Sequence, residues 1–418
     1  MDNTYLYDSP LGKYEMRYLN IFWLGLLLYT LGSIFGAIEG SLDIRICQGI
    51  EAIGLVGMIP TAIFLARAKF DSLYLKVMFL LYITWLMTII FRGDYSFNYV
   101  FVKEFLFGSN NGGLIYFAPL IVLFPRNFSY YKKLFTVITV GGALFPVLCV
   151  VFIKKLLVRG QDFQSQAVIE NLFDISIPAA FIVLTYLYHS KKTNFIAIVA
   201  VALTLAFSVF RARRGLIFIT SCLSIYSFLI YFANSKKKPF IIYFSILLLS
   251  LTAVYKSNMY DMKKNPFVGF LFERGDEDSR TPVELCFYDD MKTEDWIVGK
   301  GITGDYFCPK VEELQVTNYR TVIETGYLQL ILKGGIISLG LLLLITIPAI
   351  IKGVFFSKNI LSKAAGLWIF QCIVDLYPQN SVGFSPSYLI VWISVGICYS
   401  KDIRNLSNEA IKNILENA

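Results

Sequence analysis

Long apolar stretches recur along almost the whole chain, with only short polar segments between them. A helix needs about 20 mainly apolar residues to cross roughly 30 Å of hydrocarbon. The composition is 56% hydrophobic, and the mean hydropathy is +0.60. A soluble domain could not cover its surface with so few polar groups. The pattern therefore predicts an all-α polytopic bundle of transmembrane helices, with residues 1–418 forming one integral membrane domain.

We expect about twelve membrane spans, of which one is too short to cross alone. Gly112–Phe124 would be only about 20 Å long as a helix, which indicates a re-entrant or broken segment. The first span lacks the features of a cleaved secretory signal and is expected to stay in place. The predicted spans are Leu19–Glu39, Cys47–Ala66, Leu73–Phe91, Gly112–Phe124, Leu134–Ile153, Leu172–Tyr188, Asn194–Phe210, Gly215–Ala233, Pro239–Tyr255, Thr325–Ile351, Leu361–Tyr377 and Phe384–Tyr399.

Basic residues divide unevenly between the two sets of short loops, which predicts the orientation. With the N-terminus inside, about twice as many Lys and Arg residues fall in cytoplasmic segments as in the opposite loops. Both termini are then cytoplasmic, and the large loop 256–323, between the ninth and tenth spans, lies outside. The tail after Lys401 has apolar residues at helical spacing and predicts a short amphipathic helix.

Three arginines cluster as RARRG in a short turn between two spans: Arg211, Arg213 and Arg214. The predicted topology places this turn on the outer face, against the charge rule. Guanidinium groups are costly at the bilayer edge unless they pair with anions, and their planar fork suits phosphate oxygens. The cluster therefore either binds a phosphate-bearing lipid or anchors the span ends in the headgroup region.

The long loop and its return to the membrane supply further candidates. Arg280 lies in FERGDEDSRTP, where it either binds an anion or belongs to a solvated charged loop. Arg320 and Glu324 are four residues apart and would share one face if their segment is helical. They form either a structural ion pair or a site in which Glu324 removes a proton from a sugar hydroxyl.

The cysteine, histidine and acidic residues show no metal-ligand spacing, and we expect neither a metal nor another cofactor. His189, the only histidine, falls in a predicted cytoplasmic loop and is a poor catalytic candidate. Cys286 and Cys308 share the long loop, where they either pair as a disulfide or stay reduced. Residues 333–335 (Lys-Gly-Gly) predict a bend in a long helix. The expected partner is the lipid bilayer, and nucleic acid is not expected.

The region of residues 194–351 resembles the O-antigen polymerase and ligase superfamily of bacterial envelopes. The likeness runs from RARRG, through SRTPVELCFYDDMKTEDWIVGKGITGDYF, to YRTVIETGYLQLILKGGIISLGLLLL. It consists of an arginine–glycine pair opening a span, an outer loop with an arginine and a GxG, and a re-entry ending in a glycine-rich helix. The resemblance implies a GT-C-like fold in the bacterial plasma (inner) membrane, with the active site on the extracytoplasmic face.

The resemblance also implies a metal-independent glycosyltransferase, which transfers a glycan from undecaprenyl diphosphate to an acceptor hydroxyl. Arg214 and Arg280 match the family's arginines and would bind the donor diphosphate, with Arg211 beside them. Glu324 would act as base or positioning group next to Arg320. Tyr327, at the start of the re-entry helix, is the expected glycan contact.

The ligase branch usually carries a histidine in the stretch where this chain has none, which favours a polymerase. Its substrates would be two undecaprenyl diphosphate-linked oligosaccharides, and a chain-length regulator is a further candidate partner. Two alternatives stay open: a ligase-type glycan transferase and a non-enzymatic lipid-linked oligosaccharide flippase. A flippase would also need many spans and cationic groups, but it would not need the long loop.

Overall fold

The computed structural model describes residues 12–38, 41–93, 99–108, 112–158, 163–235, 280–309, 318–380 and 382–417. The chain is an all-α membrane protein, because seven of the helices in these ranges are long and apolar enough to cross a membrane. These seven are α2 (Lys13–Ala37), α3 (Ile44–Leu65), α4 (Leu73–Phe91), α7 (Phe128–Val151), α11 (Lys191–Phe210), α12 (Arg214–Asn234) and α18 (Gly326–Phe355).

Shorter elements connect these helices or pack beside them. The shorter helices are α5 (Tyr99–Phe107), α6 (Leu114–Phe117), η1 (Ala118–Leu123), α8 (Ile153–Leu156), α9 (Phe163–Ser176), α10 (Ala179–Leu184), η2 (Tyr186–Tyr188), α16 (Thr281–Asp290), α17 (Thr293–Val298), α19 (Ile360–Asp375), α20 (Pro386–Tyr399), α21 (Lys401–Asn405) and α22 (Asn408–Asn417). Two short strands, β1 (Tyr306–Phe307) and β2 (Tyr319–Arg320), pair antiparallel.

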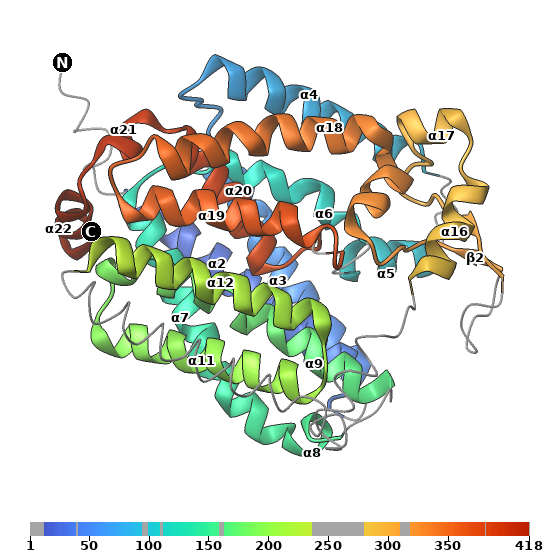
Figure 1. Ribbon diagram of the computed structural model, residues 1–418, viewed down its shortest axis with the longest axis horizontal. Helices are drawn as coiled ribbons and strands as arrows, with labels where there is room; N and C mark the ends of the chain where they lie inside the picture. Colours follow the sequence, from blue (N-terminus) through green and yellow to red (C-terminus); the bar gives the residue numbers. More distant parts are fainter. Residues whose placement is uncertain are drawn as a thin grey trace, which may run out of the picture.

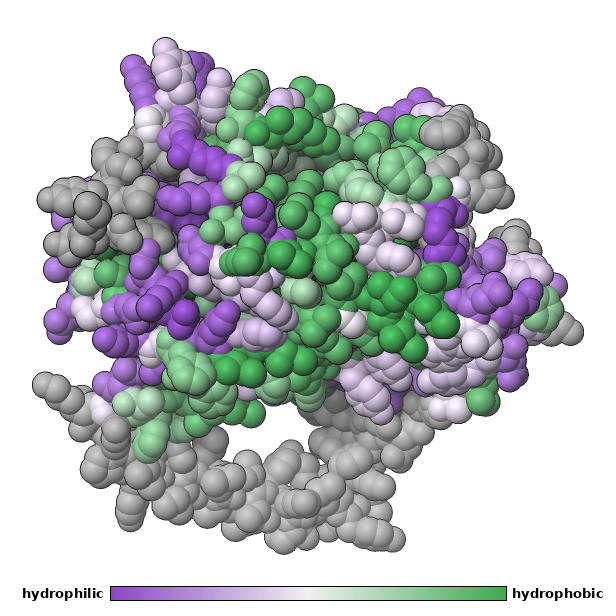
Figure 2. Space-filling view, turned by 90° about the horizontal axis from the view of Figure 1, so that it is seen from above, coloured by the Kyte–Doolittle hydropathy of each residue, from purple (hydrophilic) through white to green (hydrophobic). Residues whose placement is uncertain are grey.

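The helices run between two ends of the molecule (Figure 1). We call the end that carries α16, α17 and β2 the loop end, and the end that carries α21 and α22 the tail end. Seen from above, hydrophobic side chains cross the middle of the molecule, and hydrophilic side chains gather toward both ends (Figure 2). This distribution is the one expected when lipid solvates the middle and water solvates the ends.

Backbone and side-chain contacts identify the segments that meet at the tail end. The Arg67 backbone N–H donates to the Leu123 carbonyl at 2.7 Å, which joins the ends of α3 and η1. The Tyr188 hydroxyl donates to Asn408 Oδ1 at 2.7 Å, which joins η2 to α22. The amphipathic tail therefore packs on the bundle, where Ile411 is fully buried. These contacts lie at or beside segments predicted to be cytoplasmic, whereas the side of the membrane that this end faces stays a prediction.

The predicted short span Gly112–Phe124 is broken, since α6 has only four residues and continues as a six-residue 3₁₀ helix. The predicted span Leu172–Tyr188 is also interrupted, because α9 ends at Ser176 and Pro178 precedes α10. The predicted ninth span, Pro239–Tyr255, and residues 256–279 and 310–317 of the long loop lie outside the described residues.

Residues 280–309 and 318–325 form a small folded unit at the loop end. Cys286 and Cys308 are joined by a disulfide within it, which answers the question that the sequence left open. The unit has a hydrophobic core of its own, in which α16 and β1 pack against the first turns of α18. The buried residues of this core are Val283, Phe287, Met291, Tyr306, Cys308, Ile323, Leu328, Ile331 and Leu332.

A glycine-rich turn of this unit hydrogen-bonds to α18 where that helix is interrupted. Gly335 has φ +66°, which interrupts the helix at the predicted bend. The turn 299–301 donates backbone hydrogen bonds to the carbonyls of Leu332 (2.7 Å) and Lys333 (3.0 Å). Both glycines of the turn have positive φ, which other residues adopt only at a cost. The carbonyls of Leu332 and Lys333, which lose their helical partners at the break, are therefore hydrogen-bonded to the turn instead.

Arg92, at the end of α4, holds the same turn from the other side. Its Nη1 donates to the Val298 carbonyl at 2.6 Å, and its Nη2 donates to the Gly299 carbonyl at 2.7 Å. The Ile302 backbone N–H donates to the carbonyl of Ile89 at 3.1 Å. The loop-end unit is thus attached to two long helices, α4 and α18.

Candidate functional site

The arginine cluster lies in the turn between α11 and α12. Ala212 has φ +53° and is the one non-glycine residue with positive φ in the described part of the chain. This left-handed residue lets the chain reverse within a few positions. Arg211 is only 4% exposed, Arg213 is half-buried and Arg214 is exposed. The three arginines therefore have three different environments.

Arg213 forms an ion pair that the sequence did not reveal. Its Nη2 lies 2.8 Å from Oε1 of Glu170 in α9. Glu170 was not among the predicted site residues, and it lies 43 residues before its partner. A lone glutamate in the mainly apolar segment QAVIENL was the only signal, and it could not identify the partner.

The turn between α19 and α20, residues 376–385, brings the candidate segments together. A Cβ at Gly215 would lie 2.6 Å from Gln379 Oε1, and a Cβ at Gly326 would lie 2.8 Å from the Gln379 carbonyl oxygen. Nη2 of Arg280 donates a hydrogen bond to the Pro378 carbonyl. The starts of α12, α16 and α18 therefore meet on the α19–α20 turn, although they are far apart in the sequence.

Arg280 and Glu324, two of the predicted site residues, face each other directly. Arg280 Nε lies 3.6 Å from Glu324 Oε2, and the two side chains are 32% and 58% exposed. An ion pair this exposed contributes only about 0–1 kcal/mol to stability. Both groups therefore remain accessible to a ligand.

Arg320 does not share a helical face with Glu324, because the segment that contains them is not helical. Arg320 lies in β2, which pairs with β1, whereas Glu324 lies in the turn before α18 and contacts Arg280 instead. The side-chain oxygen of Gln329 accepts a hydrogen bond from the Ile323 backbone N–H at 2.9 Å. Strand pairing and this bond hold the segment out of helical conformation until α18 begins.

Tyr327, the predicted glycan contact, lies in the first turn of α18 and is half-buried. Its backbone N–H donates to the Leu376 carbonyl in the α19–α20 turn at 3.2 Å. Its side chain packs against the loop-end core, which includes Phe287 of α16. Tyr327 thus lies between the loop-end unit and the α19–α20 turn.

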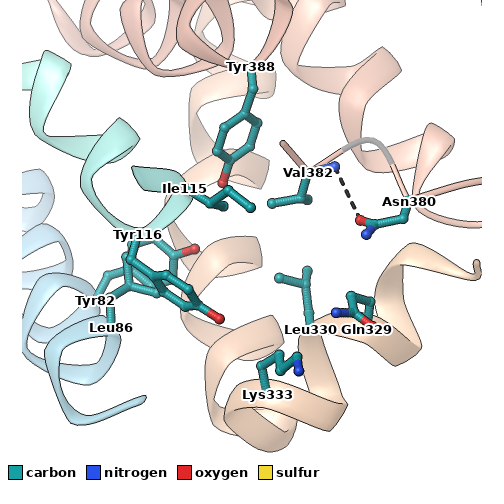
Figure 3. Close-up of a pocket in the computed structure, with 10 residues that line it drawn as sticks. All are labelled: Tyr82, Leu86, Ile115, Tyr116, Gln329, Leu330, Lys333, Asn380, Val382 and Tyr388. Atoms are coloured by element: carbon teal, nitrogen blue, oxygen red, sulfur yellow. Dashed lines mark hydrogen bonds between the residues drawn. The ribbon is translucent and has the colours of Figure 1, made fainter. Parts of the chain in front are cut away.

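A mainly apolar cavity of about 50 Å³, with a few polar groups in its lining, lies beside the α19–α20 turn, along the first half of α18 (Figure 3). This volume has room for a few water molecules. Lys333 lies at its base, is 9% exposed and donates to the Gly304 carbonyl at 2.7 Å, an internal pairing. The lining residues are Tyr82, Leu86, Ile115, Tyr116, Gln329, Leu330, Lys333, Asn380, Val382 and Tyr388.

Within the described ranges, no group of three His, Cys, Asp or Glu side chains is placed to hold a metal ion. His189 lies at the tail end, where its Nε2 is 2.8 Å from Thr185 Oγ1. The charged groups that the described contacts place around the α19–α20 turn include guanidinium and carboxylate groups. They come from α9, the α11–α12 turn, Arg280 and Glu324.

Comparisons of the chain with protein-family models, with curated proteins and with solved structures gave no match. The family resemblance drawn from the sequence motifs accordingly stays a prediction.

Proposed function

We propose that the chain is a polysaccharide polymerase of the bacterial plasma membrane, with its loop end outside. It transfers a glycan from undecaprenyl diphosphate to a hydroxyl of a second lipid-linked repeat unit. The observation that carries this proposal is the meeting of Arg280, Glu324 and the start of α12 on one turn at the polar end of an apolar bundle. A substrate with a prenyl chain in the bilayer and a diphosphate at its surface would suit this arrangement.

Arg214 and Arg280 bind the donor diphosphate in this proposal. Arg214 is exposed and Arg280 is partly exposed, so anionic oxygens can reach both guanidinium groups. Arg211 is buried and Arg213 is engaged by Glu170, which suits them to holding the turn in place. Stabilising the charge of a leaving diphosphate is the main catalytic requirement, and losing one such group typically lowers the rate by about 100- to 1000-fold.

Glu324 acts on the acceptor. Its carboxylate takes the proton of the attacking hydroxyl while the new C–O bond forms at the anomeric carbon. The bond from that carbon to the diphosphate breaks at the same time, and its electron pair leaves with the diphosphate. The nucleophile attacks opposite the leaving group, so the configuration at the anomeric carbon inverts. Arg280, 3.6 Å from Glu324, orients the carboxylate and faces the developing charge.

The test is elongation by the purified full-length protein, supplied only with undecaprenyl diphosphate-linked repeat units. Wild type, Arg214→Ala and Arg280→Ala are compared, with products resolved by length. Arg45→Ala serves as the matched control, because Arg45 is an exposed arginine at the start of α3 and has no part in the proposed site. We expect longer glycans from wild type and the control, and almost none from the other two variants.

Two outcomes would replace the proposal. Movement of intact donor across a vesicle membrane, without any elongation, would identify a flippase. Transfer only to an acceptor that carries no undecaprenyl diphosphate would identify a ligase.

A further inference from the structure

Three tyrosines from separate elements lie beside the Arg280–Glu324 pair. They are Tyr288 of α16, Tyr327 of α18 and Tyr377 of the α19–α20 turn, and we call them the tyrosine platform. Tyr327 packs against the core that contains Phe287, the residue before Tyr288. Its backbone N–H donates to the carbonyl of Leu376, the residue before Tyr377. Tyr377 directly precedes the residue whose carbonyl accepts the hydrogen bond of Arg280. The platform is therefore continuous with the proposed diphosphate site.

The platform combines exposed rings with a rigid support. Tyr377 is 74% exposed and Tyr288 is 42% exposed. The Tyr288 ring stacks on Trp296, with centroids 5.9 Å apart and an angle of 12° between the planes. Trp296 in turn packs edge-to-face at 5.6 Å on Phe287, which is fully buried in the loop-end core. Stacking on Trp296 thus restricts the orientation of the Tyr288 ring, which limits the conformational entropy lost when a ligand binds.

Carboxylates flank these rings. Glu284 of α16 accepts a hydrogen bond from the hydroxyl of Thr325, two residues before Tyr327. Glu324 is the second carboxylate, with its side chain 58% exposed. A sugar ring presents a face of C–H groups together with hydroxyls around its rim. Flat aromatic faces beside carboxylate acceptors complement both features.

Anchoring in the headgroup region is the other common role of interfacial tyrosines. Anchors of that kind act singly along a belt, whereas these three belong to distant segments that meet near one ion pair. The arrangement favours a neutral, hydroxyl-rich ligand over a lipid headgroup.

We propose that the tyrosine platform binds the sugar rings of the glycan substrate, next to the anomeric carbon at which transfer occurs. This inference rests on the proposed polymerase function, and it names the sugar subsite of that same site. Tyr377 provides the most accessible ring and makes the main stacking contact. Tyr288 and Tyr327 contribute hydroxyl groups that hydrogen-bond to the sugar.

The test measures binding of a soluble repeat-unit oligosaccharide that carries neither prenyl chain nor diphosphate. The oligosaccharide is released by mild acid from the lipid-linked repeat units of the source cell. Full-length protein in detergent is titrated with it, and contacts are followed by saturation-transfer NMR. We expect Tyr377→Ala to weaken binding about three- to tenfold, and Tyr377→Trp to restore it.

Tyr14→Ala is the matched control, because Tyr14 is also 74% exposed but lies at the start of α2. Its affinity should stay within about twofold of wild type. Tyr288→Phe keeps the stack on Trp296 and should weaken binding through loss of the hydroxyl alone. Unchanged affinity in both Tyr377→Ala and Tyr288→Phe, or no binding by wild type, would overturn the platform.

The elongation assay separates this inference from the function on which it rests. Normal elongation with an unchanged KM in Tyr377→Ala would discard the platform and keep the polymerase. If wild type binds the free oligosaccharide, Tyr377→Ala weakens that binding and wild type elongates nothing, the polymerase function is wrong and the sugar-binding role of the platform stands.

Discussion

Gly335 and Ile297 approach each other so closely that a Cβ at Gly335 would lie 2.0 Å from the Ile297 carbonyl oxygen. The contact occurs where the loop-end unit meets the break in α18. Gly335 also has φ +66°, a conformation that L side chains rarely adopt. The position therefore excludes any side chain both by its neighbours and by its backbone.

Gly335→Ala should lower the free energy of unfolding by about 2–4 kcal/mol, because overpacking and left-handed strain add together. Thermal unfolding of the purified protein in detergent measures the effect. The control is Gly340→Ala in the same helix, since a Cβ there meets nothing within 4 Å. The control should be neutral or slightly stabilising. Equal midpoints for the two variants would contradict the prediction.

Glu324→Gln should lower the elongation rate by about 100-fold or more while leaving donor binding nearly intact. The amide keeps the shape of the side chain but cannot take a proton from the acceptor hydroxyl. Initial rates over a range of donor concentrations separate kcat from KM. Glu294→Gln, at an exposed position in α17 of the same unit, is the control. A KM effect alone would assign Glu324 to binding and remove it from proton transfer.

Thiol labelling of denatured protein should modify five cysteines before reduction and seven after it. Five cysteines are free in the structure, whereas Cys286 and Cys308 are paired. The disulfide spans 22 residues and should stabilise the loop-end unit by about 3 kcal/mol in the chain-entropy account. The double variant Cys286→Ser/Cys308→Ser should therefore unfold at a lower temperature. Seven labelled thiols without reduction would refute the pairing.

Acidification should destabilise the fold through His189. Burial lowers the pKa of His189 from its ordinary value of 6.5 to about 4. Between these values the unfolded chain binds a proton that the folded chain does not. The free energy of unfolding therefore falls as the pH drops through this window, by up to about 1.4 kcal/mol per pH unit, and is constant above it.

The unfolding midpoint should thus fall less between pH 7 and pH 4.5 in His189→Gln than in wild type. Glutamine is neutral throughout this range and can still bond to Thr185 Oγ1. Parallel pH dependences for the two proteins would assign the acid sensitivity to other groups.

Hydrophobic length and glycine placement were enough to predict the long helices and the bend near Gly335. These features depend on residues close together in the sequence, as does the break within Gly112–Phe124. The loop-end unit was predicted only as a loop. Its core forms from α16, β1 and α18, and no local pattern specifies that packing.

The candidate site was predicted residue by residue but not as an arrangement. The Arg280–Glu324 pair joins segments 44 residues apart, and the Arg213–Glu170 pair joins segments 43 apart. Such contacts depend on how α9, α12 and α18 pack around the α19–α20 turn. Arg320 and Glu324 have helical spacing in the sequence, but Arg320 lies in β2, which pairs with β1 and keeps the segment from forming a helix.

The α19–α20 turn also sets the order in which the site can be completed during synthesis. Arg214, Arg280 and Glu324 are all translated before Pro378 and Gln379. Until then, the starts of α12, α16 and α18 lack the backbone on which they meet. A nascent chain thus carries every charged group of the proposed site without their final geometry. Activity would therefore begin only once the last helices have entered the membrane.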